Sequence, residues 1–298
     1  MALLEVNGVT KIFTQKNKPA HIVLEDMSFT VERGQYVSLL GPSGCGKTTL
    51  LTILGGFLTP EAGQIILAGK QVEKPGPDRG FVFQNYALFP WMTVRENIIY
   101  SLQVKKFSRQ EQAERLQELL EMSHLQGSES KYPVQLSGGM QQRVAVVRAL
   151  ASRPEILLLD EPLGAIDFQM RELLQEELAS LVEEAKTTVV MVTHDVNESV
   201  YFSDRVIVMS ALKGQIVQDV YIDLARPRNR QSKGFKDYVS DLTELVRQAF
   251  RDSIVDIELP PGFNARSTNY NCQTSFTDAY NRMTSKYTNN VTNGRIAK

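Results

Sequence analysis

A short glycine-rich segment carries the clearest chemistry in this sequence. Residues 41–48 read Gly-Pro-Ser-Gly-Cys-Gly-Lys-Thr, which is the spacing of a phosphate-binding loop. Glycines let successive backbone N–H groups turn towards one anion, and a following helix adds its positive amino-terminal end. Lys47 would reach the outer phosphates of a nucleotide, and the Thr48 hydroxyl would ligate Mg²⁺. The segment predicts nucleotide binding and does not by itself specify a reaction.

Two acidic residues follow an apolar run further along the chain. Residues 156–159 are Ile-Leu-Leu-Leu, and Asp160 and Glu161 come next. A carboxylate at the end of a strand beside a phosphate loop can hold Mg²⁺, and a second one can accept a proton from attacking water. Alone, this pattern fits a solvated turn equally well. Together with the upstream loop it indicates a catalytic site.

A second candidate anion site lies at residues 136–143, which read Leu-Ser-Gly-Gly-Met-Gln-Gln-Arg. Ser137 has the properties of an N-cap for a helix that runs to about Leu150, and the paired glycines leave backbone amides approachable. On the residues alone, an ordinary capped helix is the favoured interpretation.

The elements that must position these residues follow an alternating pattern. Strands are predicted at residues 4–9, 22–24, 36–40, 64–67, 156–159, 188–192 and 205–209, and helices at 168–184 and 196–203. This alternation predicts an α/β fold with a mainly parallel sheet and helices on its faces. Helical periodicity from Thr93 to about Gln126, with a capping box at residues 108–111, predicts an inserted helical subdomain.

Composition narrows the function classes. The 298 residues are 42% hydrophobic and 22% charged, which excludes a disordered or fibrous protein, and the net charge of -1 provides no global attraction to nucleic acid or to an anionic bilayer. Two cysteines are too few for a disulfide scaffold. The sequence begins without a signal-peptide pattern and has no apolar run of membrane-spanning length. We therefore expect a cytoplasmic protein that reaches a membrane only through a partner, and no nucleic-acid partner.

Over about residues 1–225 the chain resembles the ATPase subunit of an ABC transporter. Five elements match in order and spacing: the phosphate loop at 41–48, Gln84, the Leu-Ser-Gly-Gly signature at 136–139, Asp160-Glu161 and His194. The resemblance implies that ATP lies between the phosphate loop of one subunit and the signature of another. The active unit would then hold two such chains, either two copies or a copy and a paralogue.

The resemblance also assigns roles to single residues. It implies that Gln84 contacts Mg²⁺ and the membrane partner, that Glu161 polarises the attacking water, and that His194 touches the γ-phosphate. Phe13 would stack on adenine, and Asp167 would belong to a loop that crosses the dimer interface. Without this context, a lone Gln, His or Phe is more often structural. The implied nucleotide contacts are Phe13, Gly41, Ser43, Gly44, Cys45, Gly46, Lys47, Thr48, Thr49, Ser137, Gly138, Gly139 and Asp167, and the implied Mg²⁺ ligands are Thr48, Gln84 and Asp160.

Cys45 is interpreted as a small residue without a catalytic role, because the backbone does the binding in such a loop. As a thiol in this position, it could be sensitive to oxidants.

The segment Phe89-Pro90-Trp91 resembles the Leu-Pro-Trp segment of importers for nitrate, sulfonates, taurine and related solutes such as bicarbonate, and residues 223–229 are similar to that group as well. An importer subunit would lie at the cytoplasmic face of the cell membrane, bound to transmembrane permease subunits and served indirectly by a solute-binding protein. Four aromatics could line the groove for the membrane subunit, or could equally pack in the core: Phe83, Tyr86, Phe89 and Trp91.

Two other functions remain open on this resemblance. One is a soluble ABC ATPase of DNA repair or translation, although the chain has neither a long coiled-coil insertion nor a second cassette. The other is the ATPase subunit of an exporter. The sequence does not identify the transported solute, because that specificity resides in other chains.

We expect an ATP-binding core with an antiparallel N-terminal sheet at residues 1–92 and 151–225, a helical subdomain at 93–150, and a C-terminal extension at 226–298. Residues 235–250 fit one amphipathic helix. From about residue 264, Asn, Thr and Ser dominate, so this tail should bury too little apolar area to order itself and should be dispensable for ATP hydrolysis.

Overall fold

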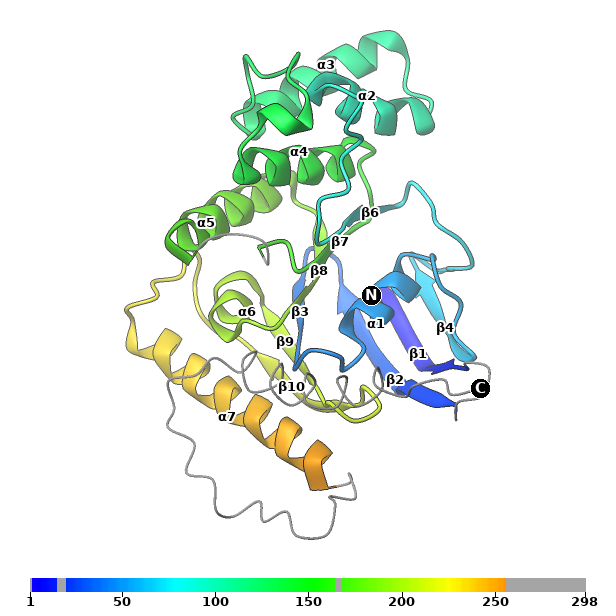
Figure 1. Cartoon of the computed structure of the whole chain (residues 1–298), viewed down its shortest axis with the longest axis vertical. Helices are drawn as coiled ribbons and strands as arrows, with labels where there is room; N and C mark the ends of the chain where they lie inside the picture. The colour runs from blue at the N-terminus through cyan, green and yellow to red at the C-terminus, as the bar shows by residue number, and fades with distance from the viewer. Residues whose placement is uncertain (1, 15–19, 164–167, 256–298) are drawn as a thin grey trace, which may run out of the picture. The chain divides into compact units, whose positions relative to one another are not determined.

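The computed structural model describes residues 2–14, 20–163 and 168–255. Asp167 and the tail from about residue 264 lie outside these ranges. The described residues through Ile254 belong to one compact unit (Figure 1). Within them, no helix is both long enough and apolar enough to cross a membrane.

A six-stranded sheet forms the centre of this unit, with the order β10-β9-β3-β8-β7-β6. Its strands are β3 (Tyr36–Leu40), β6 (Arg79–Val82), β7 (Ile156–Asp160), β8 (Thr188–Thr193), β9 (Arg205–Met209) and β10 (Ile216–Tyr221). Every residue of β3, β7, β8 and β9 is buried. Such continuous apolar runs are typical of parallel strands that are covered on both faces. The predicted α/β fold with a mainly parallel sheet is confirmed.

Neither edge strand of this sheet, β6 or β10, is among the strands predicted from sequence patterning, and β10 is the more exposed of the two. It pairs antiparallel with β9, and its residues are exposed or half-buried. An exposed edge strand needs no continuous apolar run, so its pattern is weak.

An antiparallel sheet with the order β2-β1-β4-β5 forms a second layer. Its strands are β1 (Ala2–Phe13), β2 (His21–Glu32), β4 (Ala62–Leu67) and β5 (Lys70–Gln71), and the helix α1 (Lys47–Leu54) follows β3. The buried leucines and isoleucine of α1 share one apolar cluster with residues of both sheets. The helix that follows the phosphate loop is therefore held between two layers.

The inserted helices gather at one end of the unit, drawn in teal and green in Figure 1. They are α2 (Val94–Val104), α3 (Arg109–Met122), the short 3-10 helix Pro133–Gln135 and α4 (Gly138–Ala151). Thr93 and Ser108 both close capping boxes, with Glu96 and Glu111 respectively. Together with β6, β7, β8 and the long helix α5 (Phe168–Ala185), these helices form a second apolar cluster.

The helices α6 (Val196–Phe202) and α7 (Lys233–Val255) contribute to a third cluster. Phe235 and Leu242 of α7 pack with Leu40, Val200 and neighbouring strand residues. The helix predicted at 235–250 is present and is longer than expected.

Three arginines attach the start of the C-terminal extension to α5 and α6. Arg226 donates to Phe202 O at 2.7 Å, and Arg228 donates to the carbonyls of Val200 and Ser203. These bonds satisfy carbonyls at the end of α6, where helical hydrogen bonding stops and where cations are favoured. Arg230 stacks on the Tyr201 ring at 3.7 Å and donates to α5.

Candidate nucleotide site

The phosphate loop connects the end of β3 to the start of α1. Gly46 is the N-cap of α1 and has a φ of 95°, a left-handed conformation that favours glycine. A Cβ at Gly46 would lie 2.8 Å from Leu24 Cδ2, and one at Gly41 would lie 2.8 Å from Met209 O. The loop therefore has no room for larger residues at these two positions, and its backbone can approach a bound group closely.

Lys47 is the cation at the base of this loop. Its side chain is buried, and Nζ donates to Gly41 O and Pro42 O, each at 2.8 Å. Among the described ion pairs, none involves Lys47. A buried ammonium that has only neutral acceptors is costly, so the arrangement favours an anion beside it.

A cavity of about 330 Å³ opens over the loop. Its lining consists of Val23, Ser43, Gly44, Gly46, Lys47, Thr48, Thr49 and Glu161. Loop glycines, a buried cation and three hydroxyl residues thus line one space, as a bound polyphosphate requires.

Thr48 and Asp160 form a pair of oxygen ligands beside this space. Thr48 Oγ1 donates to Asp160 Oδ1 at 2.9 Å. Burial raises the pKa of Asp160, while the hydrogen bond from Thr48 opposes that shift. Magnesium prefers one or two protein oxygens together with phosphate oxygens and waters. The described residues contain no group of three or more His, Cys, Asp or Glu side chains that could hold a metal ion by themselves, and the Thr48–Asp160 pair fits a magnesium ion held mainly by a nucleotide.

Glu161 lies between the two other polar residues that the sequence singled out. Gln84 Nε2 donates to Glu161 Oε2 at 3.1 Å, and His194 Nδ1 lies 3.3 Å from Glu161 Oε1. The contact with His194 lowers the pKa of Glu161 and raises the pKa of His194. Glu161 also has a φ of 43°, a strained conformation of the kind that clusters at functional sites.

The register of the parallel strands brings these residues together. Leu40 pairs with Thr193, Asp160 with Val192, and Val82 with Leu159. The segments that begin at Gly41, Gln84, Glu161 and His194 consequently leave the sheet at one edge. Ligands of open α/β sheets bind at this carboxyl edge.

The signature residues do not join this cavity. Ser137 caps α4 by accepting a hydrogen bond from Met140 N at 3.3 Å, as predicted. Ser137 and Gly138 are exposed, a Cβ at Gly138 would meet nothing within 4 Å, and neither residue lines the cavity. Within this chain, the first turn of α4 is free to receive a group from outside.

Phe13 and Asp167 complete the predicted set. Phe13 ends β1 with 42% of its surface exposed, and Lys11 Nζ lies 5.4 Å from its ring centre. An exposed ring in this place is available for stacking. Asp167 is outside the described residues.

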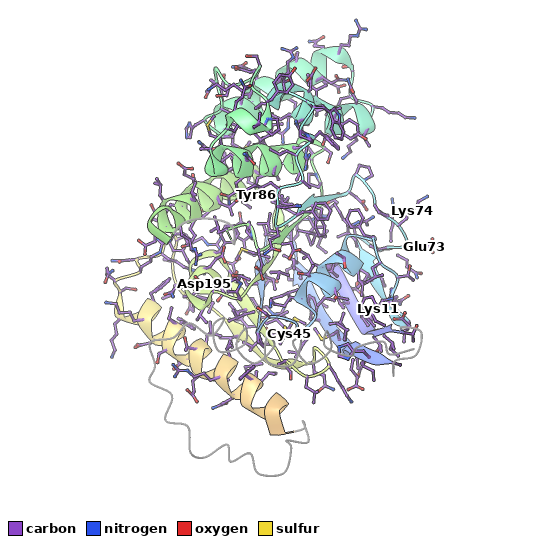
Figure 2. The ribbon with its side chains drawn as sticks, in the orientation of Figure 1. Lys11, Cys45, Glu73, Lys74, Tyr86 and Asp195 are labelled. Carbon is purple, nitrogen blue, oxygen red and sulfur yellow. The ribbon has the colours of Figure 1, made fainter. Side chains whose placement is uncertain are left out.

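The expectation that Cys45 could be sensitive to oxidants is wrong for this conformation. Cys45, labelled in Figure 2, is 1% exposed and lies in the apolar cluster around α1. Burial raises the pKa of its thiol, and a buried thiol without thiolate character reacts slowly.

The four aromatics near Gln84 divide between the two roles left open. Tyr86 is buried in the core, whereas Trp91 is 70% exposed. Phe89 is half-buried and packs against Trp91 with ring centres 5.7 Å apart. Phe83 is half-buried as well and contacts Phe57 and Phe81. Of these four side chains, Trp91 is therefore the one most available to contact another protein, and Tyr86 is a core residue.

Sequence reasoning did not find the residues behind His194. Thr193 donates to the fully buried Glu198 of α6, and Asp195 N donates to Thr193 Oγ1 at 3.0 Å. Asp195, labelled in Figure 2, also caps α6 and pairs with Arg171 of α5. A Thr-His-Asp run followed three residues later by Glu has the form of a helix cap, and that signal could have located this network.

The sequence profile of a family described as "ABC transporter" matches residues 24–164. The aliphatic sulfonates import ATP-binding protein of Bacillus thuringiensis subsp. konkukian is 43% identical over 234 residues, which cover 78% of this chain and 91% of that protein. The chain belongs to the ABC transporter family. The nitrate import ATP-binding protein of Synechococcus elongatus is also similar to this ABC protein, with 42% identity over 235 residues, 77% of this chain and 84% of the relative.

A solved structure agrees with the ABC fold. The dimeric, post-hydrolysis state of an ATP-binding cassette bound to ADP and Pi has a TM-score of 0.63 and 34% identity to this chain, and the match covers 74% of this chain and 98% of the other. Cassettes of this family bind and hydrolyse ATP. The chain is therefore an ABC-type ATPase, and its buried Lys47 and glycine loop fit the nucleotide.

Proposed function

We propose that this ABC ATPase is the ATP-hydrolysing subunit of an importer for a small oxyanion or related solute, such as a sulfonate, nitrate, taurine or bicarbonate. The observation that carries the ATPase part is the buried Lys47 facing a cavity that the phosphate loop and Glu161 line. The import part is supported by the similarity to sulfonate and nitrate import proteins. Neither a role in DNA repair or translation nor one in export is favoured by these relatives.

In this proposal, the triphosphate of ATP lies over the amides of residues 41–49, including Gly41, Ser43, Gly44, Cys45, Gly46 and Thr49, with Lys47 beside its outer phosphates. Thr48, Asp160 and Gln84 hold Mg²⁺, which supplies charge neutralisation of the phosphates. Phe13 stacks on the adenine ring.

Glu161 acts as the base that accepts a proton from the attacking water. Its carboxylate is already oriented by Gln84 and His194, which hold one oxygen each. The His194 imidazole would turn from Glu161 to the γ-phosphate when ATP is bound. Such preorganised polar groups stabilise developing charge without reorganising during the reaction.

The exposed start of α4 supplies the other half of a site. Ser137, Gly138 and Gly139 would face the phosphates of ATP held by a second ATPase subunit, with Asp167 near the same interface. The dimeric state of the similar cassette supports this arrangement. The partner is a second copy or a paralogue, in accord with the two-fold symmetry usual for such assemblies.

We further propose that the complete transporter contains transmembrane permease subunits, and that a solute-binding protein acts on the permease. The ATPase would then be a peripheral protein at the cytoplasmic face of the cell membrane. Within it, residues 1–92 and 151–225 would form the ATP-binding core, and residues 93–150 the signature subdomain. The division follows the position of the inserted helices at one end of the unit (Figure 1), where they share an apolar cluster with β6, β7, β8 and α5 of the core.

Two measurements test the proposal. The purified full chain should hydrolyse ATP when Mg²⁺ is present and lose that activity in EDTA. Expressed with the membrane proteins of its neighbouring genes, the chain should copurify with a multi-span subunit, and solute uptake should require both. Absence of hydrolysis would contradict the ATPase assignment, and copurification with a DNA-repair or ribosomal factor instead would contradict import.

A further inference from the structure

We propose that Arg148 is a positioning residue for Gln84 and that it acts by holding the turn at Tyr86 and Ala87 in a strained backbone conformation. This inference rests on the proposed function, where Gln84 belongs to the catalytic site. It adds a residue of the signature helix α4 to the machinery that sets the geometry around Glu161.

The turn itself is unfavourable. Tyr86 has a φ of 61° and Ala87 a φ of 43°, so two consecutive residues with a Cβ adopt the left-handed region that such residues rarely occupy. Strained residues of this kind persist only where their surroundings enforce them. The Tyr86 hydroxyl does not stabilise the turn, because it is buried without a hydrogen-bond partner among the described residues.

Arg148 contacts both strained residues at once. Its guanidinium donates to Tyr86 O at 3.1 Å and to Ala87 O at 2.9 Å. It also lies 5.2 Å from the Phe89 ring centre. No described carboxylate forms an ion pair with it. The planar fork of an arginine suits two carbonyls that converge in this way, whereas a lysine ammonium is a single point of contact.

Asn97 of α2 holds the other side of the same segment. It is fully buried, accepts a hydrogen bond from Phe89 N at 3.0 Å and donates to Phe89 O and Met92 O. Its Oδ1 also accepts from Arg148 at 3.3 Å. Helices α2 and α4 thus fix the chain from residue 86 to residue 92. Figure 2 labels Tyr86 at the start of this segment.

Gln84 lies two residues before this turn and two residues after the end of β6. Its backbone is therefore fixed by the sheet on one side and by the turn on the other. If the turn relaxed to a right-handed conformation, the path of residues 83–87 would change and the 3.1 Å contact between Gln84 and Glu161 would be lost.

Trp91 provides a direct readout of this segment, because it is the single tryptophan of the chain and packs on Phe89. In the Arg148→Met variant, we expect lower fluorescence anisotropy of Trp91 without nucleotide. We also expect kcat for ATP hydrolysis to fall by about tenfold or more, as for a misplaced catalytic group, with the KM for ATP unchanged. Arg148→Lys should lower the Trp91 anisotropy and kcat to a smaller extent. This variant replaces Arg148→Met in the experiment if the Met variant does not fold.

A rescue separates positioning from a general loss of packing. Glycine accepts a φ of 43° without strain, so Ala87→Gly added to Arg148→Met should restore much of the anisotropy and of kcat. Arg115→Met is the matched control. Arg115 is a buried arginine of α3 that donates to a carbonyl away from this turn, Leu150 O of α4, and its loss should change neither Trp91 anisotropy nor kcat.

The inference is overturned if both Arg148 variants keep the anisotropy and kcat of the unmodified chain, or if Ala87→Gly restores neither in a folded Arg148→Met protein. If the unmodified chain itself hydrolysed no ATP, the proposed function would fail. The anisotropy of Trp91 would still show whether Arg148 holds the turn, so the two failures are distinguishable.

Discussion

Glu161 combines a strained backbone, a lowered pKa and two polar partners in one residue. Its amide donates to Val192 O at 3.0 Å across the sheet, which fixes the residue although its φ is positive. The carboxylate remains ionised at neutral pH because the His194 contact lowers its pKa. An ionised carboxylate with both oxygens oriented is suited to accept a proton.

Replacement of Glu161 by Gln should leave ATP binding intact and lower the hydrolysis rate by at least about a hundredfold, the lower end of the range for loss of a general base. The amide keeps the shape of the carboxylate but cannot take a proton from water. ATP affinity by equilibrium binding and kcat by phosphate release would measure the two effects. Hydrolysis at the unmodified rate would remove Glu161 from its proposed role.

Glu198 makes stability depend on pH. Burial raises the pKa of this carboxyl from 4.5 to about 7. Below pH 4.5 the group is protonated in the folded and unfolded states. Between pH 4.5 and about 7 the unfolded chain releases the proton while the folded chain retains it, so the free energy of unfolding falls as the pH rises, and it levels off above that window.

We therefore expect Glu198→Gln to remove this fall in the free energy of unfolding with rising pH. Relative to the unmodified chain, the variant should gain stability as the pH rises from 5 to 8, by up to about 3 kcal/mol at 1.36 kcal/mol per pKa unit. Urea unfolding of both proteins at several pH values would measure the difference. A constant difference between them would contradict the raised pKa.

At the scale of elements, α7 supports the phosphate loop through the core. Leu242 is fully buried and belongs to the same cluster as Leu40, which directly precedes Gly41. The buried face of α7 therefore packs in the same cluster as the last residue of β3, directly before the phosphate loop.

Leu242→Ala should destabilise the chain by about 2–4 kcal/mol, because it removes buried methyl groups and leaves a cavity. The melting temperature should fall by several degrees, while ATP affinity well below that temperature stays the same. Asp241→Ala, at an exposed position of the same helix, is the control and should melt with the unmodified chain. An equal fall for both variants would contradict the assigned packing of Leu242.

The elements that were predicted from sequence share strong local signals. The strands β3, β7, β8 and β9 are mostly apolar and wholly buried. Ser108 and Ser137 cap their helices as their spacing indicated. The turn at Tyr86 and Ala87 could not be foreseen, since neither residue type favours a left-handed backbone and the groups that enforce it come from α2 and α4. Likewise, the buried state of Cys45 depends on the packing of α1 between two sheets.

At the scale of the whole molecule, half of the proposed site faces outwards. The cavity holds the phosphate loop and Glu161, whereas Ser137 and Gly138 are exposed on α4. One chain does not bring its phosphate loop and its exposed Ser137 segment to the same nucleotide. ATP hydrolysis should therefore require a dimer.

Two inactive variants should therefore restore activity when they are mixed. Lys47→Ala removes the cation of the phosphate-loop half-site. Ser137→Arg blocks the signature half-site at the start of α4. In a mixed dimer, one composite site carries both changes and the second carries neither. Equal mixing should recover about one quarter of the unmodified rate for a two-fold dimer with independent sites. ATP hydrolysis measured before and after mixing tests this, and a mixture as inactive as its components would contradict the shared site.

The aligned carboxyl ends of β3, β6, β7 and β8 also define where the chain can tolerate changes in length. Removing one residue inside β7 would draw Asp160 back by about 3.3 Å and turn its side chain to the opposite face. By contrast, the exposed Lys186 turn enters β8 from its amino end, where extra residues lengthen a connection without shifting the strand register. An affinity tag or a fluorescent domain inserted after Lys186 would therefore leave the spacing of the four site segments intact, which makes the amino edge of the sheet the place to engineer this ATPase.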